Sequence, residues 1–334
     1  MRSTLGPGEA APEVAPRERR RLDGRLVVLL VVVALYSRGT LTGSLNPVAL
    51  RTWTTVFVAI VTQALPFLVL GVLVSGAITA LVSPAALVRL LPRSPVLAVP
   101  GAALAGTALP GCECASVPIA GRLTARGVEP AAAVAFMLAA PAVNPVVLVA
   151  TAVAFPGQPR MVLARFLGSL ATSIAVGLLW WRVGDRRWVE RARQRLASAG
   201  GPGWPAFSSA ARHDLWDAGG WLVVGAAAAA TLQVLVPRSL VLAVADHPAL
   251  SVLALGGLAV LLAICSEADA FVAASLREFS LTARLVFLVV GPAVDVKLIA
   301  MQSGVFGRRF AVRFAPLTFA VAVACALLVG RVLL

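Results

Sequence analysis

The sequence predicts an all-α polytopic membrane protein, with one N-terminal span and two four-segment repeats of inverted orientation, each containing a broken or re-entrant helix. Three observations lead to this class: the composition, the length of the apolar segments and a partial internal duplication. Of the 334 residues, 59% are hydrophobic and 13% are charged, whereas soluble domains carry roughly 25% charged residues. Runs of about twenty apolar residues match a bilayer-spanning helix, and their lack of strict alternation favours helices over a barrel.

Shifts in composition divide the chain into an arm, a first span and two repeats separated by a linker. Residues 1–25 are polar and are expected to form a disordered cytoplasmic arm, and residues 26–43 form the first span. Residues 54–181 form the first membrane repeat, 182–214 a basic cytoplasmic linker and 215–334 the second repeat. The apolar segments expected within the repeats are 54–82, 95–123, 130–155, 161–181, 215–236, 250–276, 281–301 and 310–334.

The internal duplication is visible as matched spacings in the two halves. A cysteine precedes a proline by 27 residues in each half (141 − 114 and 292 − 265), in the pairs Cys114–Pro141 and Cys265–Pro292. Earlier in each half, FLVLG ending at Gly71 resembles WLVVG ending at Gly225. Matches that occur in the same order predict a repeat, which is a common feature of secondary transporters.

The arginines predict the orientation of these segments. If every segment crosses the membrane, the arginines divide evenly between the two sides. If segments 95–123 and 250–276 are re-entrant, about 20 arginines lie inside and about 8 outside, as the positive-inside rule requires. The second arrangement places the N-terminus in the cytoplasm, makes the two repeats inverted and predicts a multi-pass protein of the plasma (inner) membrane.

Candidate substrate-binding residues are polar or thiol groups that interrupt the apolar segments. They are Cys112, Glu113, Cys114, Ser116, Asn144, Cys265, Ser266 and Lys297. Cys112 and Cys114 flank Glu113, and two thiolates beside a carboxylate suit a soft cation or an arsenic(III)-type centre. Buried cysteine also packs as a small apolar residue, so both interpretations of the cysteines stay open.

Four carboxylates are candidates for proton coupling. They are Glu113, Glu267, Asp269 and Asp295. Because an unpaired buried charge is costly, such groups are expected to share a proton, bind a cation or line water. No arginine within the run that holds Glu267 and Asp269 can neutralise them. The alternative for these two residues is a helix end at the membrane interface.

Prolines are expected to break the membrane helices at Pro110, Pro118, Pro141, Pro145 and Pro292. Asn144 would then lie on an unwound turn, and Asp295 takes the same position in the second half. Lys297, the only lysine of the chain, either pairs with Asp295 or contacts an anionic or polar substrate. The N-termini of broken helices favour anions, so the sign of the substrate charge stays open.

The net charge of +14 does not indicate nucleic-acid binding, because the arginines gather near the ends of apolar segments, where they set topology. The chain contains no Walker A, GxSxG or HExxH sequence. We therefore expect neither enzymatic activity nor a cofactor. The expected partners are a small-molecule or ion substrate and the lipid bilayer, and the oligomeric state stays open.

The segment PGCECASVPIAGRLTARG, followed by AAPAVNPVVL, resembles the permease family that includes the organoarsenical efflux permeases (ArsP-like and YraQ-like). Its members share a Cys-x-Cys-x-x-x-Pro pattern before a proline-bearing segment, here Cys112, Cys114, Pro118 and then Pro141. The resemblance covers most of the chain beyond the first span. It implies a multi-spanning inner-membrane permease in which Cys112 and Cys114 are soft-ligand candidates.

Together these features predict a secondary transporter that exports a small solute by alternating access, driven by a proton gradient. A soft metal, a metalloid or an organoarsenical species is the expected class of solute. The alternatives are a passive channel, a membrane scaffold subunit and a thiol-based membrane redox protein.

Overall fold

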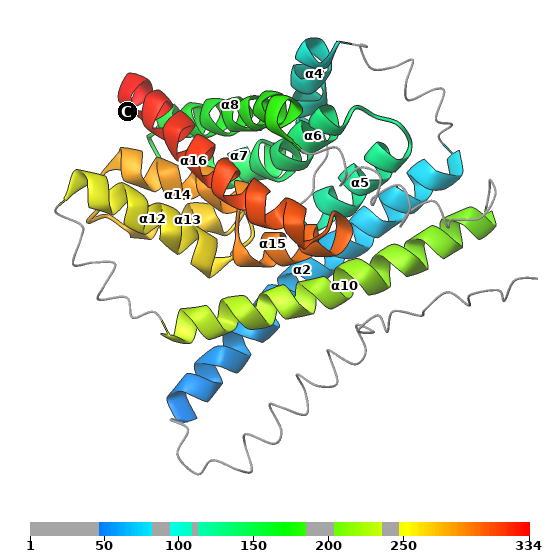
Figure 1. Cartoon of the computed structure of the whole chain (residues 1–334). Coiled ribbons are helices and arrows are strands. Elements are labelled where there is room, and N and C mark those ends of the chain that lie inside the picture. The colour runs from blue at the N-terminus through cyan, green and yellow to red at the C-terminus, as the bar shows by residue number, and fades with distance from the viewer. Residues whose placement is uncertain (1–46, 82–93, 109–112, 185–203, 236–246) are drawn as a thin grey trace, which may run out of the picture.

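The computed structural model describes residues 47–81, 94–108, 113–184, 204–235 and 247–334, and the regular structure of these residues is entirely helical (Figure 1). The helices are α2 (Pro47–Leu81), α4 (Pro95–Thr107), α5 (Glu113–Ala125), α6 (Pro130–Ala142), α7 (Pro145–Ala154), α8 (Pro159–Val183), α10 (Trp204–Leu235), α12 (Pro248–Leu262), α13 (Asp269–Ser275), α14 (Leu281–Ala293), α15 (Val296–Val305) and α16 (Arg308–Leu333). The predicted all-α class is confirmed. The expected arm and first span lie outside the described residues.

Five stretches of the described chain are long and apolar enough to cross a membrane. They are Val48–Val74, Pro130–Ala154, Pro159–Val183, Leu281–Val305 and Arg308–Leu333. The second and fourth each consist of two successive helices, α6 with α7 and α14 with α15. Most of the residues in these two broken spans are buried inside the protein, whereas most of the last span is not. The broken spans therefore form the interior of the helix bundle.

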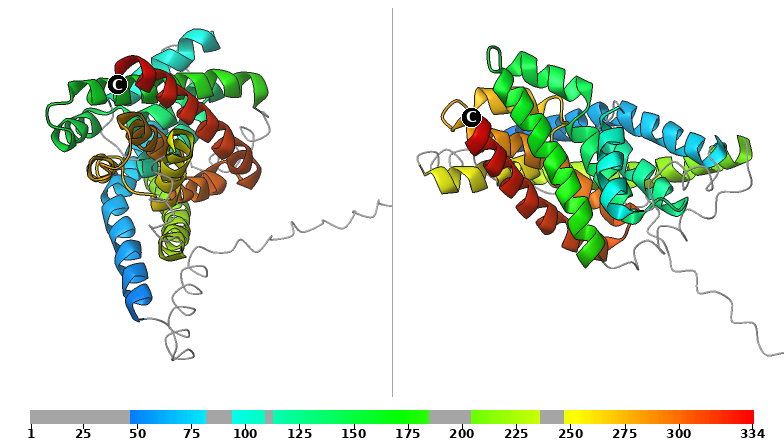
Figure 2. Two further views of the ribbon diagram at one scale, coloured as in Figure 1. Left: turned by 90° about the vertical axis from the view of Figure 1, so that its left-hand side faces the viewer. Right: turned by 90° about the horizontal axis from the view of Figure 1, so that it is seen from above.

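The two broken spans lie between two pairs of longer helices (Figures 1 and 2). Helices α2 and α10 pack together along one side of the molecule, and α8 and α16 pack together on the opposite side. Between them, α6 packs against α4 and α8, while α14 packs against α12 and α16. Short α5 contacts α2, and short α15 contacts α10. Among the short helices, α5 contacts α15, and α7 contacts α13.

Each broken span is interrupted at a residue that caps the following helix. Asn144 precedes α7, and its Oδ1 atom accepts a hydrogen bond from the backbone N–H of Val147 at 3.0 Å. Asp295 precedes α15, and its Oδ1 atom accepts one from the N–H of Leu298 at 2.5 Å. A side-chain oxygen at this position satisfies a backbone donor that the helix cannot.

The structure corrects the expected effect of individual prolines. Pro145 is the first residue of α7, a position where the missing N–H costs nothing. Pro141 and Pro292 lie inside α6 and α14, so each interruption comes just after the proline rather than at it. The prediction was wrong for Pro118, because α5 continues through this residue. A proline removes one hydrogen bond, and packing on both sides can hold the helix together without it. Pro110 lies outside the described residues.

The helix that leads into the second repeat begins earlier than its composition suggested. Helix α10 begins at Trp204, so residues 204–214 are helical and continue directly into the apolar segment. Pro205 lies in the first turn of the helix, where its fixed φ angle favours a helix start. Residues 204–214 are polar, so the apolar segment was predicted to begin only at residue 215. Polar residues can nevertheless continue a helix.

Two glycines allow the long helices to approach the centre closely. A Cβ atom on Gly71 of α2 would lie 2.5 Å from Cα of Ala115 in α5. A Cβ atom on Gly225 of α10 would lie 2.7 Å from Cα of Lys297 in α15. Both distances are well inside van der Waals contact. These are the two glycines that the sequence comparison of the halves had aligned.

Replacing either glycine with alanine is expected to lower the unfolding temperature of the purified protein in detergent. The added methyl group would force two backbones apart, at a cost of about 1–3 kcal/mol. Gly257→Ala is the matched control, because no atom lies within 4 Å of its Cβ position and alanine is favoured in a helix by roughly 0.5–1 kcal/mol. Equal unfolding temperatures for Gly71→Ala, Gly225→Ala and Gly257→Ala would contradict the close approach.

Candidate functional site

A buried lysine joins the two halves of the chain. Lys297 lies in the first turn of α15, and its Nζ atom is 2.5 Å from Oε1 of Glu113 at the start of α5. Asp295 Oδ2 is 3.9 Å from the same nitrogen. Lys297 Nζ also donates a hydrogen bond to the carbonyl oxygen of Ala263 at 3.4 Å. The side chains of Lys297, Glu113 and Asp295 are each at most 1% exposed. The pair therefore lies in the protein interior, where a charge without a partner would be costly.

The non-helical segment between α12 and α13 supplies further contacts to Glu113. Ser266 Oγ donates a hydrogen bond to Glu113 Oε2 at 3.3 Å, so both carboxylate oxygens have a partner. Ala263, which ends α12, has φ 49° and ψ 40°, a left-handed conformation that is uncommon for alanine. This conformation turns the chain out of the helix and presents the Ala263 carbonyl to Lys297. The site is thus made by helix ends and unwound backbone.

A second buried ion pair lies on the other side of Ser266. Arg165 of α8 is fully buried, and its Nη2 atom is 2.9 Å from Oδ1 and 3.0 Å from Oδ2 of Asp269 at the start of α13. The same nitrogen donates to the carbonyl of Ser266 at 2.9 Å, and Nη1 donates to Thr151 Oγ1 of α7 at 2.8 Å. Arg165 thereby ties together α7, α8 and α13. Ser266 contacts both ion pairs, through its hydroxyl and through its carbonyl.

Arg165 supplies Asp269 with the counter-charge that the sequence run around Glu267 and Asp269 lacks. The prediction for these two residues considered only the local run, whereas Arg165 precedes Asp269 by 104 residues. A signal was present in the sequence, since Arg165 interrupts the apolar segment 161–181. An ionisable residue within a membrane segment is a functional candidate by default. Arg165 therefore belongs with the four carboxylates as a candidate functional residue.

Three buried atoms of these groups have no hydrogen-bond partner among the described residues. They are Nε of Arg165, Oδ1 of Asp269 and Oδ2 of Asp295. Asp269 Oδ1 is close to the guanidinium of Arg165 but is not aligned for a hydrogen bond. Most buried polar atoms in proteins have a hydrogen-bond partner. Several buried atoms without one, close together, are therefore expected at a site that binds a further ion or proton.

The other predicted residues have different surroundings. Cys114 and Cys265 are buried cysteines, and both are electrostatic neighbours of the Lys297 ammonium. Ser116 donates to the backbone carbonyl of Glu113 at 3.1 Å. Asn144 donates from Nδ2 to the Ala140 carbonyl at 3.0 Å, a bond local to its helix interruption. Glu267 is only half-buried.

Cys112 lies outside the described residues, so the proposed soft-ligand pair of Cys112 and Cys114 stays a prediction. Within the described part of the chain, no group of three His, Cys, Asp or Glu side chains is arranged to hold a metal ion.

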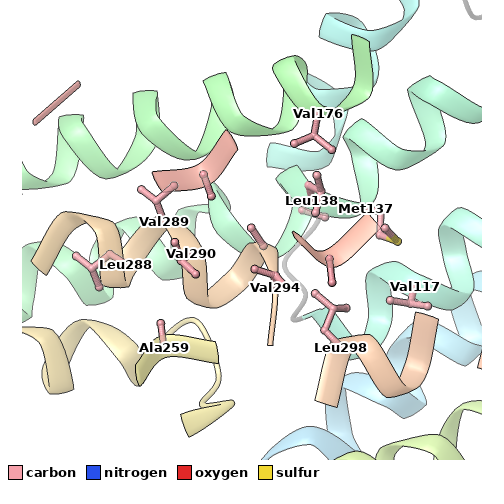
Figure 3. Close-up of a cluster of buried hydrophobic side chains, with 14 of the residues drawn as sticks. Val117, Met137, Leu138, Val176, Ala259, Leu288, Val289, Val290, Val294 and Leu298 are labelled. Carbon is pink, nitrogen blue, oxygen red and sulfur yellow. The ribbon is translucent and has the colours of Figure 1, made fainter. Parts of the chain in front are cut away.

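Buried apolar side chains lie on the helices that carry the Lys297 pair. Figure 3 shows Val117 of α5, Met137 and Leu138 of α6, Val294, which precedes Asp295 in the sequence, and Leu298, which follows Lys297, in one buried hydrophobic cluster. All five side chains are at most 4% exposed. This packing keeps water away from the carboxylates and strengthens the attraction between opposite charges. The site therefore combines a polar centre with a dry apolar wall.

The chain matches the family described as predicted permease over residues 49–331, which includes both broken spans. UPF0718 protein YcgR of Bacillus subtilis is 37% identical over 261 residues, covering 76% of this chain and 89% of the relative. A putative two-component membrane permease complex subunit of Streptococcus mutans is 30% identical over 282 residues, covering 82% of this chain and 94% of the relative. No solved structure matches the chain. The family resemblance inferred from the cysteine and proline motifs is confirmed, and this multi-pass membrane protein belongs to the predicted permease family.

Proposed function

We propose that this chain is a secondary transporter of the plasma membrane, and that its transport site is the cluster around Lys297 and Glu113. The observation that carries the proposal is the buried ion pair of these two residues, 2.5 Å long, which joins the first half of the chain to the second. Transporters place their sites near mid-membrane, where interrupted helices expose backbone groups. Charged residues inside a membrane protein mark such pathways.

An inverted repeat would explain why the two halves contribute matching parts. The helices from α4 to α8 and from α12 to α16 follow the same order, and each set contains a span that is interrupted after a Pro-Ala pair. Asn144 and Asp295 have the same capping role. In the proposed transport cycle, the elements of one repeat move relative to those of the other and expose the site alternately to the two sides. Re-entrant segments at 95–123 and 250–276 belong to the same proposal.

Proton coupling is proposed because negative charge exceeds positive charge in the cluster. Three fully buried carboxylates, Glu113, Asp269 and Asp295, face two buried cations, Lys297 and Arg165. Glu267 is half-buried nearby and adds a further acidic group. Because excess buried charge is unfavourable, uptake of a proton would be stabilising. Alternate loading and release of that proton would drive efflux of the solute.

The solute proposed is a small soft metal, metalloid or organoarsenical species. Cys114 and Cys265 are buried thiols contributed by the two halves, and both lie near Lys297. Thiolates are ligands for soft centres. A strain lacking the gene, challenged with metal ions, arsenicals and oxyanions, is expected to accumulate one of these classes more than the complemented strain. Equal accumulation of every compound in the two strains would contradict export of this solute class.

Glu267→Gln is expected to reduce transport of the identified solute in proteoliposomes and to weaken its dependence on an imposed pH gradient. The amide is similar in size but cannot carry the proton, so the gradient would lose its coupling group. Glu278→Gln is the control, because Glu278 is an exposed glutamate of the same region. Unchanged gradient dependence in Glu267→Gln, and in Glu267→Gln combined with Asp269→Asn, would show that these groups do not couple transport to protons.

A second candidate is a permease that works only with another chain. It is favoured by the name of the Streptococcus mutans relative, which describes a subunit of a two-component complex. Proteoliposomes containing only the purified chain distinguish the two candidates. Transport by the chain alone supports the first, and transport that requires a second protein supports the second.

A further inference from the structure

The ammonium group of Lys297 has three oxygen atoms as its hydrogen-bond and ion-pair partners among the described residues. They are Glu113 Oε1, Asp295 Oδ2 and the Ala263 carbonyl, at 2.5, 3.9 and 3.4 Å. We propose that these oxygens form a binding site for one small monovalent cation, and that Lys297 occupies this site in the present conformation as a tethered substitute. The inference rests on the proposed transport function, because it assigns to the same cluster a second ion, which is distinct from the soft solute and competes with the coupling proton for the excess negative charge.

The charges around Lys297 match a single additional positive charge. Glu113 and Asp295 supply two negative charges, and Lys297 supplies one positive charge. The Cys114 and Cys265 thiols are also electrostatic neighbours of Lys297, and they add no positive charge. Arg165 already lies within 3.0 Å of Asp269. One monovalent cation therefore neutralises the three charges of Glu113, Asp295 and Lys297, whereas a divalent ion would leave these three groups with excess positive charge.

The backbone around Lys297 is also arranged for a cation. Ala263 is the C-cap residue that follows α12, and the carbonyl end of a helix carries partial negative charge. Its left-handed conformation aims the carbonyl at the ammonium instead of continuing the helix. Backbone held in a rare conformation is concentrated at functional sites. Oxygen ligands of this kind suit hard cations rather than soft ones.

The open oxygen of Asp295 gives Lys297 a second place to bind. Oδ1 of Asp295 is used by the Leu298 N–H, whereas Oδ2 is buried, has no hydrogen-bond partner and lies 3.9 Å from Nζ. A cation that arrives at Glu113 would displace the ammonium toward this oxygen. The lysine would then exchange one carboxylate for the other, so neither charge would be left alone. This exchange provides two arrangements of the same site, one with the cation and one without it.

Lys297→Ala tests the site directly, because it removes the tethered substitute. The unfolding temperature of the purified variant in detergent is measured against increasing sodium, potassium or methylammonium chloride, with tetramethylammonium chloride as a cation too large for the site. A saturable rise is expected for at least one small cation. The concentration for half of the rise should be about tenfold or more below that of the wild type, where the ammonium competes. A preference for methylammonium would indicate an organic cation, and a preference for sodium or potassium an inorganic one.

The double variant Lys297→Ala with Glu113→Gln is the control, since it lacks a carboxylate of the site. It is expected to show no saturable rise. The same rise in the double variant, or an equal rise with tetramethylammonium, would overturn the proposal. Binding without any transport in proteoliposomes would contradict the proposed function alone, and transport without cation binding would contradict this inference alone.

A measurement on the unaltered chain remains available if Lys297→Ala does not fold. Lys297 is the only lysine, so reductive methylation followed by mass spectrometry of its peptide reports its accessibility. Saturating sodium or potassium is expected to increase the methylation rate several-fold relative to tetramethylammonium, because the displaced lysine exchanges its 2.5 Å ion pair with Glu113 for the oxygen of Asp295 and is held less tightly. Equal rates in all three salts would overturn the proposal.

Discussion

Replacing Arg165 with methionine is expected to lower the free energy of unfolding by about 3–5 kcal/mol, because it leaves Asp269 buried without its counter-charge. Arg165 Nη2 lies 2.9 Å from Asp269 Oδ1, and the arginine is fully buried. The guanidinium also satisfies the Ser266 carbonyl and the Thr151 hydroxyl, which would lose a donor. The measurement is the thermal unfolding temperature of the purified protein in detergent, together with its yield from membranes.

The double variant Arg165→Met with Asp269→Asn separates the lost charge balance from the lost packing. It is expected to recover part of the stability, because neither residue is then charged. Recovery should be incomplete, since Ser266 and Thr151 still lack their donor. Arg160→Met is the matched control, because Arg160 lies on the same helix but is exposed. If Arg165→Met lowers the unfolding temperature no more than Arg160→Met does, a structural role for the Arg165–Asp269 pair would be contradicted.

The sequence predicted the positions of most helices because apolar length and arginine placement are local properties. Segments 130–155 and 281–301 correspond closely to the two broken spans that the structure contains. The interruptions were expected near Pro141 and Pro292, and they lie just beyond these residues. The start of α10 was missed, since residues 204–214 are polar and yet helical.

The partners of the buried charges could not be predicted in the same way. Lys297 was expected to pair with Asp295, two residues earlier, or to contact substrate. Its shortest ion pair is instead with Glu113, which lies 184 residues earlier, while Asp295 is farther away. Asp295 uses one oxygen to cap α15, a role that its position just before a helix allows. The choice between a near and a distant partner depends on how α5 and α15 pack, which one sequence does not specify.

The tertiary arrangement also explains why residues with no charge matter at this site. Ser266 contacts Glu113 through its hydroxyl and Arg165 through its carbonyl, so a movement of the 263–268 segment alters both ion pairs at once. Gly225 lets α10 lie directly against the backbone of Lys297. Both residues are positioning residues, because they act on charged groups rather than on a ligand. Neither role follows from residue type alone.

Glu113→Gln is expected to abolish transport and to lower the free energy of unfolding by about 3–5 kcal/mol, because Lys297 then keeps only a carboxylate at 3.9 Å. Lys297→Met should have an effect of similar size, since it leaves Glu113 and Asp295 together without a cation. Unfolding in detergent and transport in proteoliposomes are measured on the same preparations. Ser116→Ala is a nearby control, because the Ser116 hydroxyl donates its hydrogen bond to the backbone carbonyl of Glu113 and not to its carboxylate.

The double variant Glu113→Gln with Lys297→Met distinguishes a role of this ion pair in stability from a role in transport. Removing both charges together is expected to restore much of the unfolding free energy, because well-packed neutral side chains can replace a buried ion pair. Transport should remain absent, since the carboxylate that exchanges its cation is gone. Recovery of transport with recovery of stability would contradict a functional role for the pair. A stable protein that does not transport would place the transport chemistry at the carboxylate that joins the two halves.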